Sequence, residues 1–170
     1  GVVQAAPEVD HAAAIVVVVF DTVALVVGAR RSAEVAVPQQ WAEDEGVQKF
    51  YLPGIDSSEI ENMLLLEAKF PGKCIAMMGL HPCYVKENYK EELRLVGDWL
   101  AKRKFSAVGE IGIDHYWDKT FVKEQEEAFR VQIEWSIQYN LPINIHTRNA
   151  MQETIDIVKE YVPKGVRGIF

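Results

Sequence analysis

Short runs of apolar, mostly β-branched residues alternate along the chain with longer segments in which apolar residues recur at helical spacing. Six runs have the length and composition of strands: Ala14–Phe20, Val47–Leu52, Lys73–Gly79, Phe105–Glu110, Leu141–His146 and Val166–Phe170. The segments between them predict helices at about 33–45, 57–69, 88–103, 119–139 and 149–161. This alternation is typical of βα units around a parallel sheet, which makes the fold class α/β.

Two of the predicted helices carry apolar stripes that we expect to face the core. In the segment 57–69 the stripe consists of Leu64, Leu65 and Ala68. In the segment 88–103 it consists of Leu93, Val96, Trp99 and Leu100. Both helices are therefore expected to pack on the sheet.

Six strands and five helices fit either a doubly wound open sheet or part of a TIM-type (β/α)8 barrel. Neither glycine-rich nucleotide-binding loop pattern follows the first strand, so the nucleotide-binding form of the open sheet has no support. Polar residues stand where the predicted strands end, namely Asp21, Asp56, His81, Glu110, Asp114, His146 and Arg148. In a barrel these ends share one rim, where active sites form. The pattern favours an incomplete barrel, because the complete fold typically needs ~250 residues.

Length and composition fit one folded domain. The chain has 170 residues, a net charge of −7 and 49% hydrophobic residues, so we expect residues 1–170 to form a single incomplete barrel domain with 1–13 as an extension. The excess of acidic residues argues against a basic surface that wraps long nucleic acid, but it is compatible with a site for one or two phosphates.

Cysteine content and the longest apolar run bear on localisation. The two cysteines, Cys74 and Cys83, lack the spacing of a zinc ribbon and read as reduced thiols. The run from Ala12 to Phe20 is shorter than the ~20 residues of a membrane span, and acidic residues precede it. We therefore expect a cytoplasmic protein with no membrane association and no obligate protein partner.

Glu110 and His146 are the strongest candidates for chemistry. Each ends a predicted apolar strand, where a buried polar side chain is costly unless it has a partner. A carboxylate and an imidazole on one rim suit a divalent metal, and a carboxylate can bridge two metals. On spacing alone, Glu110 also fits a helix cap or a surface charge, and His146 also fits a hydrogen-bonded core histidine.

Four further residues lie near the same predicted rim. Arg148 suits a phosphate, or a solvated surface position, and Asp114 could orient a ligand or cap a turn. His81 precedes Pro82, which on spacing alone predicts a simple turn. Cys83 beside His81 suggests a Cys/His nucleophile, but no third orienting group is placed.

Three segments carry a family resemblance: Gly79–Pro82, Val108–Asp114 and Pro142–Ala150. In order and spacing they resemble the signatures of TatD-related metal-dependent deoxyribonucleases, and the likeness extends over about residues 44–170, including Gln125, Phe129 and Gln132. The resemblance implies an amidohydrolase-type barrel that cleaves phosphodiester bonds in DNA with one or two divalent metal ions, of Mg, Mn or Zn type. It further implies Glu110 as catalytic, metal-bridging carboxylate, His146 as metal ligand, His81 and Arg148 as substrate contacts, and Asp114 as support.

The chain also departs from the family pattern. Family members carry Asp-Thr-His-x-His after the first strand, whereas this chain has Val23 and Leu25 at the two histidine positions. The next family histidine is expected immediately after Phe170, so the chain resembles a C-terminally truncated member in which two metal ligands survive. We therefore expect this chain itself to be inactive. Two alternatives stay open: a hydrolase of small esters or amides, and a non-catalytic remnant or binding module.

Overall fold

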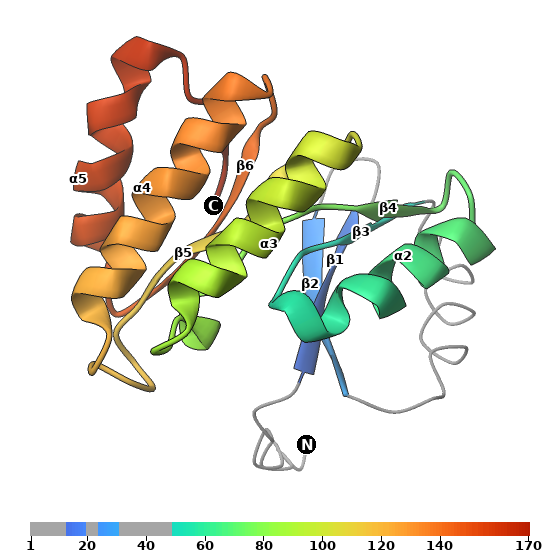
Figure 1. Cartoon of the computed structure of the whole chain (residues 1–170), viewed down its shortest axis with the longest axis horizontal. Coiled ribbons are helices and arrows are strands. Elements are labelled where there is room, and N and C mark those ends of the chain that lie inside the picture. Colours follow the sequence, from blue (N-terminus) through green and yellow to red (C-terminus); the bar gives the residue numbers. More distant parts are fainter. Residues whose placement is uncertain (1–12, 20–23, 31–48) are drawn as a thin grey trace, which may run out of the picture.

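The computed structural model describes residues 13–19, 24–30 and 49–170, with side chains from residue 49 onward (Figure 1). The strands are β1 Ala13–Val19, β2 Ala24–Arg30, β3 Lys49–Leu52, β4 Cys74–Ala76, β5 Val108–Asp114, β6 Ile143–Arg148 and β7 Gly168–Ile169. The α-helices are α2 Ile60–Lys69, α3 Tyr89–Lys102, α4 Val122–Gln138 and α5 Met151–Tyr161. Three 3-10 turns complete the elements: η1 Ser57–Glu59, η2 Pro82–Tyr84 and η3 Val162–Lys164.

The strands from β3 onward are parallel and follow one another in chain order. β3 pairs with β4, and β5 pairs with β6, which pairs with β7. A parallel bridge between Met78 and Val108 connects the two groups. Parallel neighbours in chain order, each followed by a helix, form the wall of a (β/α) barrel, and this chain contains part of that barrel.

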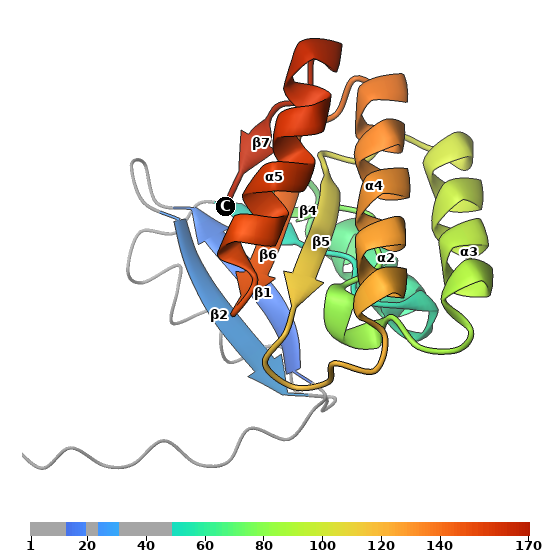
Figure 2. The ribbon, with the colours of Figure 1, turned by 90° about the vertical axis from the view of Figure 1, so that its left-hand side faces the viewer.

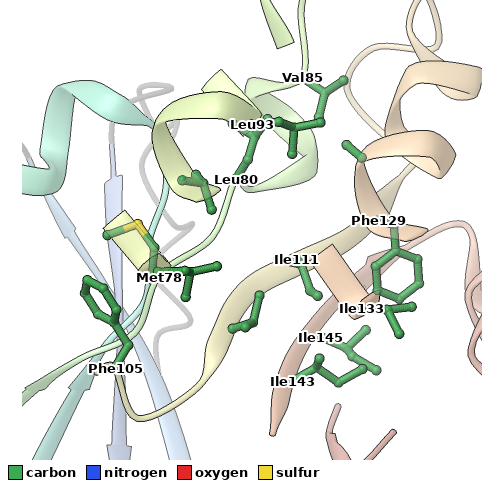
Figure 3. Packing of buried hydrophobic residues seen from close by; sticks show 14 of the residues in the cluster. Met78, Leu80, Val85, Leu93, Phe105, Ile111, Phe129, Ile133, Ile143 and Ile145 are labelled. Atoms are coloured by element: carbon green, nitrogen blue, oxygen red, sulfur yellow. The ribbon is translucent and has the colours of Figure 1, made fainter. Parts of the chain in front are cut away.

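The helices cover the outer side of this wall, and Figure 2 shows α5, α4 and α3 side by side along it. The sequence of α4 explains its orientation, because Ala128, Phe129, Gln132 and Ile133 are all buried and recur at helical spacing. In Figure 3, Phe129 and Ile133 face the isoleucines of β5 and β6. This packing fixes the two strands that carry most of the candidate site.

Several predicted boundaries shift. The predicted strand Phe105–Glu110 ends too early, because β5 continues to Asp114 and Glu110 is an interior residue of the strand. His146 is likewise interior, because β6 continues to Arg148. β5 is buried along its whole length, and its register with β6 shifts between Gly109 and Ile111, the residues that flank the carboxylate.

The prediction for the N-terminal strand is wrong in orientation and incomplete in number. β1 runs antiparallel to both β2 and β3, whereas a barrel of βα units predicts a parallel first strand. β2 is a strand that the pattern analysis missed, which raises the number of strands in the described residues above the predicted six. Two apolar runs separated by only four residues pair more readily with each other than through a crossover, which needs a dozen or more residues.

The stripe predicted for the first described helix is confirmed only for Leu64, which is half-buried and packs against the core. In α2 the buried residues are Ile60 and Met63, while Leu65 is 66% exposed and Ala68 is exposed. The stripe predicted for α3 is confirmed, because Leu93, Val96 and Leu100 are buried. The predicted helix at 33–45 and the extension at 1–13 fall almost entirely outside the described residues. No helix in the described part of the chain is long and apolar enough to cross a bilayer.

Candidate active site

The neighbouring strands β5 and β6 position the candidate site. Their parallel register places Gly112 beside His146 and Asp114 beside Arg148. The close approach requires glycine at position 112, where φ is +147° and an added Cβ would lie 1.9 Å from the His146 carbonyl oxygen. The strands can therefore approach closely enough for the Glu110, Asp114 and His146 side chains to meet.

The imidazole of His146 lies between two carboxylates. Its Nε2 is 2.8 Å from Asp114 Oδ2, and its Nδ1 is 3.4 Å from Glu110 Oε1. Burial lowers the pKa of His146, but the hydrogen bonds to Glu110 and Asp114 outweigh burial and raise the pKa above its usual value. Without a metal, the two carboxylates thus favour the positively charged form of this ring.

Asp114 is the most firmly held carboxylate of the site, with 1% of its surface exposed. Its Oδ1 accepts hydrogen bonds from the backbone N–H groups of Tyr116 and Trp117, at 2.8 and 3.3 Å. Its own N–H donates to Gln125 Oε1 of α4 at 2.9 Å. Burial opposes ionisation, yet the hydrogen bonds from His146 and the two amides lower the pKa of Asp114. The aspartate therefore orients His146 as an anion.

His81 reaches the same edge from the segment that follows β4. The residue before it, Leu80, is bound through both of its backbone groups by the Gln132 side chain of α4. Gln132 accepts from the Leu80 N–H at 2.6 Å and donates to the Leu80 carbonyl oxygen at 3.1 Å. The His81 ring lies 4.4 Å from the His146 ring, centroid to centroid. Burial and the neighbouring His146 lower the pKa of His81 to about 4, so the ring is neutral at pH 7.

Two buried polar atoms of the site have no hydrogen-bond partner among the residues that the structure describes: Glu110 Oε2 and His81 Nε2. A buried carboxylate oxygen without a hydrogen bond is costly unless a ligand satisfies it. Glu110 and His146 supply oxygen and nitrogen donors of the kind that bind divalent metals, and Asp114 beside His146 forms the usual carboxylate support of a metal-bound histidine. The residues present therefore fit a divalent metal ion.

A thiol completes the cluster, although no spacing in the sequence indicates Cys83 as a metal ligand. One donor atom each from His81, Cys83 and His146 lie within 4.8 Å of one another. Burial and the Asp114 carboxylate raise the pKa of Cys83 to about 12. The thiol is therefore protonated and unreactive as a nucleophile at neutral pH, which removes the support for the Cys/His nucleophile. Only the fold could bring Cys83 to His146, because the two are far apart in sequence.

Arg148 lies at the exposed side of the site, on an aromatic surface. Its guanidinium carbon is 3.5 Å from the Tyr116 ring centroid and 5.1 Å from the Trp117 ring centroid. Tyr116 is 48% exposed and Trp117 is 51% exposed. Stacking on the rings orients the arginine while leaving its donors accessible. No pattern in the sequence marks Tyr116 or Trp117 as part of the site.

Other strand-end residues have different places. Asp56 caps η1, where its Oδ1 accepts from the Ser58 N–H at 2.9 Å, and it is not part of the cluster. Asp21 and Val23 lie outside the described residues. Leu25 belongs to β2, where its backbone pairs with Val18.

A curved wall of parallel strands with carboxylates and imidazoles gathered at its carboxyl edge is the architecture of a (β/α)-barrel enzyme. The family model described as TatD related DNase matches residues 28–170. The chain belongs to this family.

Individual relatives agree with the family assignment. An uncharacterized metal-dependent hydrolase, YabD, of Bacillus subtilis is 33% identical over 75% of this chain and 50% of its own length. A 3'-5' ssDNA/RNA exonuclease TatD of Yersinia pseudotuberculosis is 27% identical over 72% of this chain and 47% of its own. The crystal structure of YJJV, a TatD homolog from Escherichia coli, matches with a TM-score of 0.68 at 24% identity, over 76% of this chain and 52% of that one. The chain spans about half the length of the curated relatives that it matches.

Proposed function

We propose that this chain carries the active-site edge of a metal-dependent hydrolase that cleaves phosphodiester bonds in nucleic acid. The observation that carries the proposal is the convergence of Glu110, Asp114, His81 and His146 at one edge, with Glu110 Oε2 and His81 Nε2 buried and unpartnered. Several relatives are named as 3'-5' ssDNA/RNA exonucleases, which supports nucleic acid as the substrate class.

Glu110 and His146 would hold the metal ion. A bound divalent cation supplies a hydroxide at neutral pH and neutralises charge on the phosphate oxygens. Glu110 Oε2 is available to a metal, because it accepts no hydrogen bond from the described part of the chain. Asp114 fixes the His146 ring through the 2.8 Å contact at Nε2, so the imidazole keeps its orientation when the Nδ1 side binds. The metal's identity is open among Mg, Mn and Zn.

The substrate side rests on His81 and Arg148. His81 Nδ1 accepts from the Cys83 N–H at 3.1 Å, so the proton of the neutral ring is on Nε2. This buried, unpartnered N–H can donate to a phosphate oxygen. Arg148 presents charged donors beside exposed Tyr116 and Trp117, and a cation flanked by aromatic rings is a common surface for single strands.

Two alternatives compete with this function. A hydrolase of small esters or amides would use the same metal site but would not need the Arg148 surface. A non-catalytic binding module is the other, and Val23 and Leu25 at the positions of two family histidines favour it. We expect catalysis by this chain to fall far below that of members that carry both histidines, so binding is the primary measurement.

The test is a fluorescence titration of the chain with a single-stranded oligothymidylate at several salt concentrations. Exposed Trp117 should report binding, and Arg148→Gln should weaken it and reduce the salt slope by about 0.7, the value for one phosphate contact on a single strand. Arg167→Gln is the matched control, because Arg167 bonds to Asn140 before the start of β6 and should leave binding unchanged.

Hydrolysis is assayed in parallel on the oligonucleotide and on a panel of small esters. Any Mn²⁺-dependent cleavage of the oligonucleotide should disappear in Glu110→Gln. Ester hydrolysis without oligonucleotide binding would reject the nuclease in favour of the first alternative, and oligonucleotide binding without metal-dependent turnover, even after Val23→His with Leu25→His, would favour the binding module.

A further inference from the structure

A thiol and two imidazoles meet beside the proposed metal site. The donor atoms of His81, Cys83 and His146 lie within 4.8 Å of one another. In a tetrahedral zinc site the Zn–N and Zn–S bonds of about 2.0–2.3 Å place ligand atoms roughly 3.3–3.6 Å apart. The three donors therefore need to approach one another by roughly 1 Å to share one ion.

His81 independently indicates a ligand at this position. The side chain is 5% exposed, and its Nε2 has no hydrogen-bond partner in residues 49–170, whose side chains the structure describes. The neutral ring holds one lone pair, now used by the Cys83 N–H at 3.1 Å. Coordination through Nδ1 would exchange this single hydrogen bond for a metal bond, whereas coordination through Nε2 would first require its proton to move to Nδ1.

We propose that His81, Cys83 and His146 bind a thiophilic divalent cation, of the Zn²⁺ and Cd²⁺ class, with Cys83 as a thiolate ligand. Thiolate and imidazole donors select such ions over Mg²⁺ and Mn²⁺, which prefer oxygen. On binding, the sulfur–metal bond forms and the thiol proton leaves to solvent. The Glu110 and Asp114 carboxylates beside His146 add negative charge that favours the cation.

This site goes beyond the proposed hydrolysis. It shares the His146 side chain with the Glu110 site. It requires neither Glu110 as a ligand nor any substrate. Its occupancy can therefore be measured whether or not the chain hydrolyses phosphodiesters.

The experiment is a Co²⁺ titration of the whole chain, followed by near-ultraviolet absorption. Bound Co²⁺ should give a thiolate-to-metal charge-transfer band that saturates at one equivalent and that Zn²⁺ removes by displacement. Cys83→Ser should abolish the band and weaken Zn²⁺ binding by on the order of 100-fold or more, because even an outer partner of a metal ligand is worth 10–100-fold. Cys74→Ala, which alters the chain's other cysteine, should keep the band. Glu110→Gln should also keep it, which separates this site from the hydrolytic one.

A second measurement uses the unmodified protein. Cd²⁺ should protect Cys83 from alkylation, as read by mass spectrometry, while Mg²⁺ at the same concentration should not. A wild-type titration without the charge-transfer band, a band retained in Cys83→Ser, or equal alkylation of Cys83 with and without Cd²⁺ would each overturn the proposal.

Discussion

The rings of His81 and His146 lie 4.4 Å apart and tilted by 55°, yet their pKa values shift in opposite directions. Burial and the neighbouring His146 lower the pKa of His81 to about 4. The carboxylates of Glu110 and Asp114 overcome burial and raise the pKa of His146. His81 is therefore the neutral ring, as expected of a hydrogen-bond donor to a phosphate. His146 is the more basic ring, as expected of a metal ligand.

The His81 shift predicts a pH dependence of stability. The folded-state pKa of about 4 lies below the ordinary value of 6.5, so on acidification the unfolded chain takes up this proton first. The contribution of His81 to stability is present above about pH 6.5 and is lost as the pH falls towards 4, by about 3 kcal/mol in total. Urea unfolding from pH 4 to 7.5 should show that His81→Gln lacks this component. Equal pH slopes for the two proteins would contradict the assignment.

Asp114 should contribute more to stability than an exposed aspartate. Asp114→Asn removes the negative acceptor of His146 and of two backbone N–H groups in a buried position, and we expect a loss of about 2–3 kcal/mol. Asp118→Asn removes the exposed ion pair with Lys86 and should cost less than about 1 kcal/mol. Chemical denaturation of both variants measures the difference, and equal losses would mean that the site carboxylate is not structurally engaged.

Gln132 should be needed to keep the chain around His81 in place. Gln132→Leu leaves the buried Leu80 N–H and C=O without their side-chain partner, which should cost about 2–4 kcal/mol. Gln138→Leu changes an exposed residue of the same helix and should be nearly neutral. Comparison of melting temperatures tests this, together with the chemical shift of the His81 imidazole, which should move only in Gln132→Leu.

Gly112 should tolerate no side chain. An added Cβ would lie 1.9 Å from the His146 carbonyl oxygen, so Gly112→Ala must force β5 and β6 apart and should cost more than about 3 kcal/mol. Gly72 also has a positive φ, of +78°, but open space around the position of a Cβ, so Gly72→Ala should cost only about 1 kcal/mol. If both variants unfold at the same denaturant concentration, the close approach of the strands is not decisive.

The sequence predicted the parallel strands and the gathering of polar residues well from β3 onward, because buried strands and amphipathic helices leave distinct periodicities. It placed the ends of β5 and β6 too early, because the polar residues Glu110 and His146 indicate the end of an apolar run. The strands continue beyond them, to Asp114 and Arg148. It misjudged α2 because the choice of stripe depends on which face meets the sheet, and Leu65 lies on the solvent face.

The candidate site was only partly predictable. Glu110, His146, His81 and Asp114 stand out because each is a polar residue at or near the end of an apolar run. The contacts that define their chemistry are long-range, such as His146 to Asp114 and Gln132 to Leu80, and no local pattern encodes them. Cys83 joins the cluster for the same reason, through the fold rather than through its spacing.

The most direct test of the proposed metal site is calorimetric titration of the chain with Mn²⁺, which disfavours the thiolate of Cys83. We expect weak binding that Glu110→Gln reduces at least about tenfold and that Glu61→Gln, an exposed change on α2, leaves unchanged. If Glu110→Gln binds Mn²⁺ as well as the unmodified chain does, Glu110 is not a metal ligand and the account of this edge as a hydrolytic metal site is wrong.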